Sequence, residues 1–306
     1  MTAPASPASQ GVTVRLAGGL GNQLFQYAAA REVAARLDCP MLVDTSGLAR
    51  VGPGDTPREF ALGWLVDAAH VLDGGSAHAP GRLRAALERR VPALARGQVF
   101  QQQGFGYDAR IADVQRGVVL AGYFQSARYF AQVEHELRAD ILARIPRSAW
   151  RTEAEAQLQG LGSWIAVHVR RGDYLLARNT AYHGLLGRPY YARALAALAE
   201  RGVTGTVALF SDDPAAAREM LGDLAAGAIV LEPASSANAA ESIALMAGAP
   251  AVVTANSSFS WWAGWLGDPA STVVACPTPW LHEARLDERD LRPPAWIVVD
   301  AGFDEA

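Results

Sequence analysis

The chain of 306 residues contains no lysine, so all 27 of its basic residues are arginines. With 31 acidic residues the formal net charge is −4, which argues against nucleic acid as a bulk partner. Arginine in place of lysine is typical of a GC-rich genome. The number of arginines therefore indicates nothing about function, and only their positions can.

Cysteine and long apolar runs are also scarce. Cys39 and Cys276 fit no metal-ligand spacing, and two cysteines make no disulfide framework, which favours a reducing cytoplasm. The opening MTAPASPASQG has neither an apolar run nor a basic residue, so we predict a disordered tail over residues 1–11 instead of a signal peptide. No stretch approaches the ~20 apolar residues that span a bilayer. We expect a cytoplasmic protein with at most peripheral contact at the inner membrane.

The hydrophobic pattern predicts an α/β fold. A strand at 12–16, the turn AGGLGNQ, a helix over 24–38 and a strand at 41–44 form a βαβ unit, which implies a parallel sheet. Further strands are expected at 117–124, 164–169, 206–211, 228–232, 251–255 and 272–276, and helices at 130–145, 189–201, 214–224, 240–249 and 260–267. We predict two Rossmann-like doubly wound domains, 12–150 and 151–306, that face a cleft and bind ligands at the carboxyl ends of their strands.

The stretch WIAVHVRRGDY (164–174) ends a predicted strand with two arginines. Side chains alternate across a strand, so His168 and Arg170 share one face near its carboxyl end, while Arg171 points elsewhere. A guanidinium offers a planar fork of donors that suits phosphate. An ion pair with Asp173 or another carboxylate fits the spacing equally well.

The stretch TANSSFSWWAGWLG (254–267) brings Asn256, Ser257 and Ser258 to a strand end, just before a predicted helix. Hydroxyls and backbone N–H groups at a helix N-terminus can bind an anion without a metal. The alternative is ordinary capping of that helix by Ser258 or Ser260. We predict that the three tryptophans belong to the core.

Two other stretches have polar residues at strand ends. In LFSDDP (209–214), Asp212 and Asp213 could bind the ribose hydroxyls or the guanine N–H edge of a nucleotide, or Asp213 could cap the helix that Pro214 begins. The pattern is not Asp-x-Asp and no His or Cys cluster accompanies it, so we predict no metal site. GGLGNQ (18–23) lacks the full G-x-G-x-x-G pattern of dinucleotide-binding turns.

Together, RLAGGLGNQLFQYAAAR, GYFQSARYF, VHVRRGDY and NSSFSWWAGWL resemble the four hallmark segments of bacterial α-1,2-fucosyltransferases, glycosyltransferase family 11, in order. HGLLGRPYYARAL and FSDDP match segments that lie between them, and the resemblance extends from about residue 12 to 298. It implies the GT-B architecture and inverting, metal-independent transfer of fucose from GDP-L-fucose to the 2-hydroxyl of galactose, with no cofactor. The partners would be GDP-fucose, bound mainly by the C-terminal domain, and a galactose-terminated glycan, bound mainly by the N-terminal one.

The resemblance also implies roles for individual residues. Arg170 would lie against the β-phosphate, where charge develops as GDP leaves, and Asn22 would lie near the fucose and the acceptor. The implied donor-binding set is Gly21, Asn22, His168, Arg170, Arg171, Asp212, Asp213, Ser257, Ser258 and Phe259. Asp173 is the candidate general base, although a carboxylate beside two arginines has a lowered pKa and is a weak base. Glu241 is a further acid without an assigned place.

Other functions stay open. Enzymes of similar architecture make α-1,6 or peptide O-linked fucose, so the α-1,2 linkage depends on the resemblance. A nucleotide-dependent oxidoreductase built on GGLGNQ is disfavoured because nothing resembles a hydride-transfer site. A non-catalytic nucleotide- or glycan-binding protein is disfavoured by the intact His168, Arg170 and serine positions.

Overall fold

The computed structural model describes residues 11–48, 58–72, 99–172, 184–233, 239–282 and 287–303. The chain divides into two compact units, residues 1–141 and 142–306. The sequence-based boundary at residue 150 falls inside helix α4 (Ala149–Gln159), which lies wholly in the second unit. A hydrogen bond of 2.8 Å from Ser148 Oγ to Glu241 Oε2 fixes the start of α4 to that unit. The division of donor and acceptor binding between the units stays a prediction.

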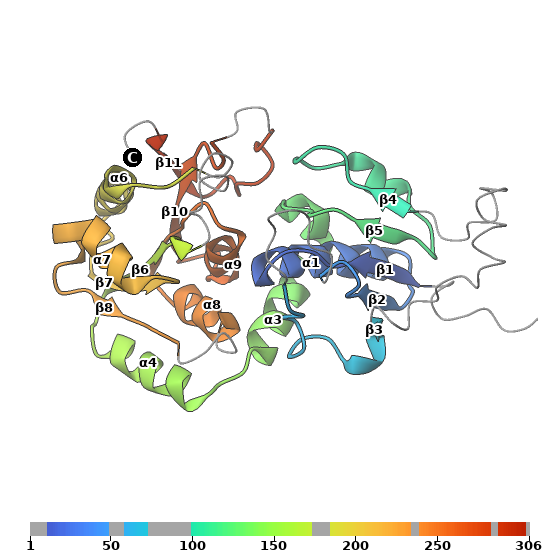
Figure 1. The fold of residues 1–306 in the computed structure, drawn as a ribbon, viewed down its shortest axis with the longest axis horizontal. Helices are drawn as coiled ribbons and strands as arrows, with labels where there is room; N and C mark the ends of the chain where they lie inside the picture. The colour runs from blue at the N-terminus through green and yellow to red at the C-terminus, as the bar shows by residue number, and fades with distance from the viewer. Residues whose placement is uncertain are drawn as a thin grey trace, which may run out of the picture. The chain divides into compact units, whose positions relative to one another are not determined.

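The first unit contains a five-stranded sheet in the order β3-β2-β1-β5-β4 (Figure 1), in which every described pairing is parallel. The strands are β1 (Val12–Arg15), β2 (Met41–Asp44), β3 (Val71–Leu72), β4 (Val99–Gln101) and β5 (Val119–Ala121). Helix α1 (Leu20–Arg36) connects β1 to β2, and η5 (Ala127–Val133) and α3 (Glu134–Arg144) follow β5. Short 3-10 helices precede β3 (η2, Ala68–His70) and β5 (η4, Ala109–Asp113). The predicted βαβ unit is confirmed; nearly all of the predicted tail lies outside the described residues.

The second unit contains a six-stranded parallel sheet in the order β11-β10-β9-β6-β7-β8. Its strands are β6 (Trp164–Val169), β7 (Thr206–Ser211), β8 (Ile229–Val230), β9 (Ala251–Val253), β10 (Val273–Thr278) and β11 (Ile297–Asp300). The five predicted strands are confirmed. We did not predict β11, an edge strand of which only Val299 is buried.

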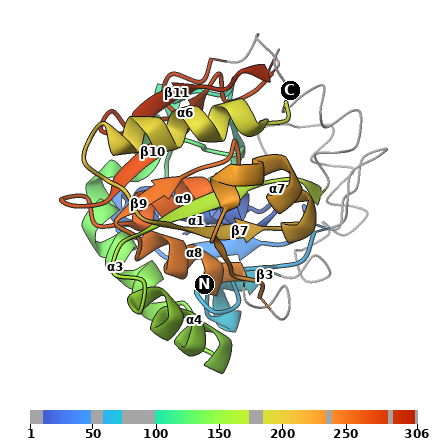
Figure 2. The same ribbon diagram turned by 90° about the vertical axis from the view of Figure 1, so that its left-hand side faces the viewer.

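Helices cover both faces of this second sheet. Helices α6 (Arg188–Ala199) and α7 (Pro214–Leu221) pack on one face, and Figure 2 shows the molecule from their side. Helices α8 (Ala239–Ala247) and α9 (Ser258–Leu266) pack against each other, with α9 next to β9. The 3-10 helix η7 (Gly222–Ala225) follows α7. Trp261, Trp262 and Trp265 are buried, which confirms that they belong to the core. No helix in the described parts of the chain is long and apolar enough to cross a membrane.

In each sheet the first strand of the chain lies in the middle. The strands that follow it are added on one side, and later strands are added on its other side. This reversal of strand order lies between β1 and β5 in the first unit and between β6 and β9 in the second. Ligands of doubly wound sheets bind at the carboxyl ends of the strands at such a reversal. The prediction of two Rossmann-like α/β units is confirmed, and the cleft between them stays a prediction.

Candidate active site

Three loops meet at the carboxyl edge of the second sheet, where the strand order reverses. Strand β6 pairs with β7 on one side and with β9 on the other. The segments that follow these strands are therefore neighbours in space although they are far apart in sequence. They are residues 170–172, 212–213 and 254–257. This edge holds most of the predicted donor-binding residues.

Arg170 is oriented by an ion pair with Asp212, the residue that follows β7. Arg170 Nη1 lies 3.0 Å from Asp212 Oδ2, and each side chain is 25% exposed. The other oxygen, Oδ1, accepts a hydrogen bond of 2.8 Å from the backbone N–H of Arg171. The ion-pair alternative is thus realised with Asp212, and Asp173 lies outside the described residues. A guanidinium has five N–H donors, so pairing with a carboxylate is compatible with binding a phosphate.

His168 is a buried, neutral group beside Arg170. Its ring lies 5.3 Å from that of Phe259, centroid to centroid, and its Nδ1 is buried without a hydrogen-bond partner among the described residues. Burial, and then the positive charge of Arg170, lowers the pKa of His168 to about 3. The imidazole is therefore neutral at physiological pH. The opposite face of β6 belongs to the core and consists of Ile165, Val167 and Val169, as the alternation predicts.

The buried imidazole makes the stability of this unit depend on pH. In the unfolded chain a histidine titrates near pH 6.5 and in the folded one near 3, so below about 6.5 only the unfolded chain takes up the proton. We expect this group to lower the free energy of unfolding by up to ~1.4 kcal/mol per pH unit as the pH falls from about 6.5 towards 3. Urea unfolding from pH 7 to 4 should show a flatter dependence for His168→Asn. The exposed His70→Asn is the control, and equal slopes for wild type and His168→Asn would contradict the expectation.

The N-terminus of α9 lies at the same edge, because only four residues separate the end of β9 from the start of the helix at Ser258. Ser257 is the N-cap, and its side chain accepts a hydrogen bond of 3.3 Å from the N–H of Phe259. Ser260 Oγ instead accepts from the N–H of Ala255 at 3.1 Å. Capping therefore involves Ser257, and not Ser258 or Ser260 as we had considered. A capped helix N-terminus still carries the positive end of the helix dipole, which favours an anion.

Two adjacent tyrosines of α6 hold the two central strands at this edge. The hydroxyl of Tyr190 donates to the carbonyl of Thr254, just after β9, at 2.6 Å, and that of Tyr191 donates to the carbonyl of His168 in β6 at 3.2 Å. Burial raises the pKa of both phenols, so they stay protonated and remain donors. Helix α6 thereby holds the carboxyl ends of β6 and β9 at a fixed spacing, and the other site residues come directly after these ends.

Removing one of these hydroxyls should loosen the edge without opening a large cavity. We expect Tyr190→Phe to lose ~1–3 kcal/mol of stability, because the buried Thr254 carbonyl is left without its donor. Tyr191→Phe should lose less, since its hydrogen bond is longer. Chemical denaturation of the two variants measures this difference. Equal stability of Tyr190→Phe and wild type would contradict it.

The remaining acidic and basic residues have local structural contacts. Asp213 Oδ1 accepts a hydrogen bond of 3.1 Å from the N–H of Ala216. Asp213 therefore caps α7, which was the alternative to nucleotide binding in the sequence analysis. Arg171 is buried, and its backbone N–H donates to Asp212. Glu241 is buried and accepts hydrogen bonds from the N–H and Oγ of Ser148. Donor binding by Asp213 and Arg171 stays a prediction.

The predicted site residues of the first unit lie at its own reversal of strand order, between β1 and β5. Asn22 Oδ1 accepts a hydrogen bond of 2.6 Å from Gln125 Nε2, which joins the start of α1 to the loop after β5. Gly18 has a φ of +77°, and a Cβ there would lie 2.5 Å from Asn22 Nδ2, so the turn requires glycine. Gly21 is buried in the first turn of α1.

Sequence reasoning missed Tyr190, Tyr191, Thr254 and Gln125. Thr254 is fully buried, and its Oγ1 has no hydrogen-bond partner among the described residues, like Nδ1 of His168. The pair Tyr190-Tyr191 in a helical apolar pattern was a usable signal, because a buried tyrosine hydroxyl needs a hydrogen-bond partner. Nothing in the sequence around Gln125 identifies Asn22 as its partner.

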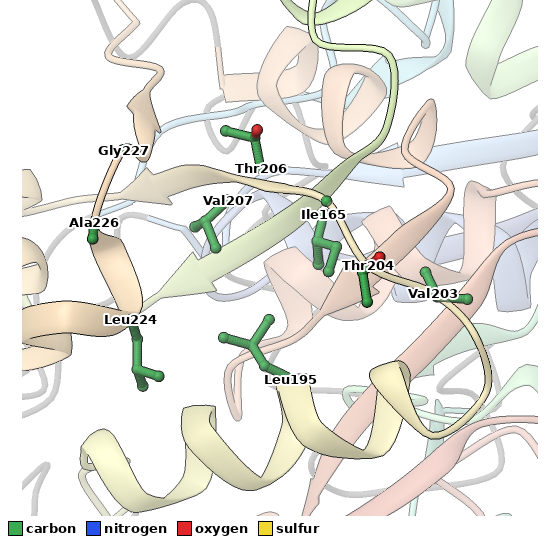
Figure 3. A pocket seen from close by; sticks show the side chains of 10 residues that line it. Ile165, Leu195, Val203, Thr204, Thr206, Val207, Leu224, Ala226 and Gly227 are labelled. Carbon is green, nitrogen blue, oxygen red and sulfur yellow. The ribbon is translucent and has the colours of Figure 1, made fainter.

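A surface pocket of about 460 Å³ lies elsewhere on the second unit (Figure 3). It is lined by Ile165 at the start of β6 and by Thr206 and Val207 at the start of β7, with small and aliphatic side chains around them. The pocket is therefore at the amino ends of the strands, opposite the edge described above. Its position at the amino ends of the strands makes it a poor candidate for the active site, because ligands of doubly wound sheets bind at the carboxyl ends.

Residues 113–300 match the family described as Glycosyl transferase family 11, which is more than half of the chain. The protein therefore belongs to glycosyltransferase family 11. Among curated proteins it is 27% identical to an alpha-1,2-colitosyltransferase of Escherichia coli, over 94% of this chain and 99% of the relative. It is 25% identical to the O-antigen biosynthesis glycosyltransferase WbnK of Escherichia coli, over 92% of this chain and 98% of that protein.

A galactoside 2-alpha-L-fucosyltransferase, SEC1 of Bos taurus, is 29% identical over 52% of this chain and 44% of its own length. Among solved structures, the fucosyltransferase NodZ from Bradyrhizobium aligns with a TM-score of 0.48 at 15% identity, over 84% of this chain and 93% of NodZ. The sequence-based recognition of the family is thus confirmed.

Proposed function

We propose that the protein transfers L-fucose from GDP-β-L-fucose to the 2-hydroxyl of a terminal galactose, with inversion and without a metal. The bond between the fucose anomeric carbon and the β-phosphate oxygen breaks, and a bond from that carbon to the acceptor oxygen forms on the opposite face. GDP leaves with the bonding electrons, and the proton of the acceptor hydroxyl passes to a base.

The observation that carries the proposal is the placement of Arg170, paired with Asp212, and of the N-terminus of α9 at the carboxyl edge of the second sheet. Arg170, oriented by Asp212, and the N-terminus of α9 supply the positive charge that a departing diphosphate requires. His168 is neutral and buried against Phe259, so it suits a hydrogen bond to the nucleotide but not proton transfer at neutral pH. Belonging to a family of glycosyltransferases makes a nucleotide sugar the fitting ligand.

The base and the acceptor complete the proposal. Asp173 is separated from the arginine pair by one residue in the sequence and stays the candidate base. A carboxylate close to two guanidinium groups has a lowered pKa and is therefore a weak base. An O-antigen glycan is a fitting acceptor, because WbnK acts in O-antigen biosynthesis.

GDP-colitose is a second donor to be tested directly. The alpha-1,2-colitosyltransferase covers nearly the whole chain, and colitose is fucose without its 3-hydroxyl. A site that hydrogen-bonds the 3-hydroxyl rejects the deoxy sugar strongly, whereas a site that does not contact it accepts both. Comparing kcat/KM for GDP-fucose and GDP-colitose decides between the two donors.

The function is tested by GDP release from GDP-fucose in the presence of EDTA, with lactose or N-acetyllactosamine as acceptor. Acceptor-dependent release, with an α-1,2 linkage in the product by NMR, is the expected result. Loss of activity in EDTA with recovery on adding Mg²⁺ would contradict metal independence, and an α-1,6 product would contradict the linkage. Absence of thermal stabilisation by any GDP sugar would contradict the donor class.

A further inference from the structure

The loop after β5, at the carboxyl edge of the first sheet, carries an exposed aromatic ring and, two residues further on, a carboxamide that pairs with a second one. Tyr123, in the loop after β5, is 46% exposed. Two residues further on, Gln125 donates to Asn22 at 2.6 Å, and both side chains are partly exposed. The ring and the amide pair therefore lie where the strand order of the first sheet reverses, between β1 and β5.

Two further glutamines hold the loops of this edge in place. Gln26 is buried, accepts from the N–H of Ala17 at 3.0 Å and donates to the carbonyl of Gly122 at 3.0 Å, so it ties the loop after β1 to the loop after β5. Gln102 Oε1 accepts from the consecutive N–H groups of Tyr123 and Phe124 at 3.0 and 2.9 Å.

These hydrogen bonds hold the backbone of the loop after β5 in a conformation that non-glycine residues disfavour. Phe124 has a φ of +52°, in the left-handed region, which costs a non-glycine residue ~1–2 kcal/mol. The strained Phe124 lies between Tyr123 and Gln125, and it sets the directions in which the chain continues from one to the other. Such a conformation persists because its surroundings over-determine it, and strain of this kind is concentrated at functional sites.

The chemistry of this edge differs from that of the second unit. A carboxamide both donates and accepts, so Asn22 and Gln125 match hydroxyl groups, which do the same. The charged residues at the ends of β1 and β2, Arg15 and Asp44, pair with each other at 3.3 Å. An amide pair with an exposed ring fits an uncharged sugar, whose hydroxyls are polar and whose C–H face is apolar.

We propose that Tyr123, Gln125 and Asn22 form the binding subsite for a neutral hexopyranoside, the acceptor sugar of the proposed transferase. The Tyr123 ring covers the C–H face of the sugar, and the amide pair orients its hydroxyls. Gln125 and Tyr123 are thus specificity-determining residues. The assignment of this sugar as an acceptor rests on the proposed function, but its binding does not.

The test compares Tyr123→Ala, Gln125→Ala and Gln125→Glu with wild type. Gln125→Glu keeps the shape but replaces the amide donors by a charge. Gln115→Ala is the matched control, because Gln115 is an exposed glutamine that precedes β5 at the opposite end of that strand. The readouts are the KM for N-acetyllactosamine, the affinity for GDP, and saturation-transfer NMR of N-acetyllactosamine, which needs no turnover.

We expect the KM for N-acetyllactosamine to rise about tenfold or more in the three subsite variants, as the loss of one good contact would give, with GDP affinity unchanged. Their saturation-transfer signal should fall well below that of wild type, while that of Gln115→Ala matches wild type. If wild type binds the disaccharide but does not turn over GDP-fucose, the proposed function fails and the subsite stands. No binding by wild type, or binding retained in Tyr123→Ala and Gln125→Ala, overturns the subsite.

Discussion

Arg170→Ala is expected to slow GDP release from GDP-fucose about 10²–10³-fold, the usual effect of removing one donor from a developing negative charge. Its ion pair with Asp212 is partly exposed, and such pairs contribute only ~0–1 kcal/mol to stability, so the variant should stay folded. The loss should therefore appear in kcat. Initial rates with saturating GDP-fucose and N-acetyllactosamine, in EDTA, measure it.

Two further variants separate charge from geometry. Arg170→Lys keeps the positive charge but not the planar fork that meets Asp212, so we expect an intermediate rate. Arg289→Ala removes a highly exposed arginine that also pairs with an aspartate, Asp287, and should behave as wild type. A rate for Arg170→Ala equal to that of Arg289→Ala would show that the diphosphate is stabilised elsewhere.

Gly172→Ala should reduce activity although Gly172 has no side chain to contribute. A Cβ at this position would lie 2.2 Å from Asp212 Oδ2. Asp212 is held from two sides, by Arg170 Nη1 and by the N–H of Arg171, so it cannot move without releasing Arg170. We expect kcat/KM for GDP-fucose to fall at least about tenfold, and stability by ~1–3 kcal/mol from the steric conflict.

Gly248→Ala is the matched control for this substitution. A Cβ at Gly248 meets its nearest atom, the carbonyl oxygen of Leu245, at 3.4 Å, which is an ordinary contact. This variant should keep both activity and stability. Equal activity of the two alanine variants would mean that the orientation of Asp212 does not matter for the reaction.

The elements that were easiest to predict are those buried on both faces of a sheet. Strands β6 and β7 have the predicted bounds, and each contains a run of buried apolar residues because central strands of a doubly wound sheet contact helices on both sides. The edge strand β11 was not predicted. It pairs with β10 alone, and only Val299 of its four residues is buried. The boundary was predicted at residue 150, ahead of the alternation that resumes at Trp164. Helix α4 at this position has only two buried residues, Ala154 and Leu158, so its apolar pattern is weak.

Local chemistry was predictable, and its partners were not. The sequence by itself determined the family, the two α/β units and the alternation that places Ile165, Val167 and Val169 on the core face of β6, because these follow from motif order and strand periodicity. Only the tertiary structure decided that Asp212 pairs with Arg170, that Tyr190 contacts Thr254 and that Gln125 contacts Asn22. Each of these contacts joins residues that come together only when parallel strands distant in sequence become neighbours in a sheet, and no local pattern specifies which strands do so.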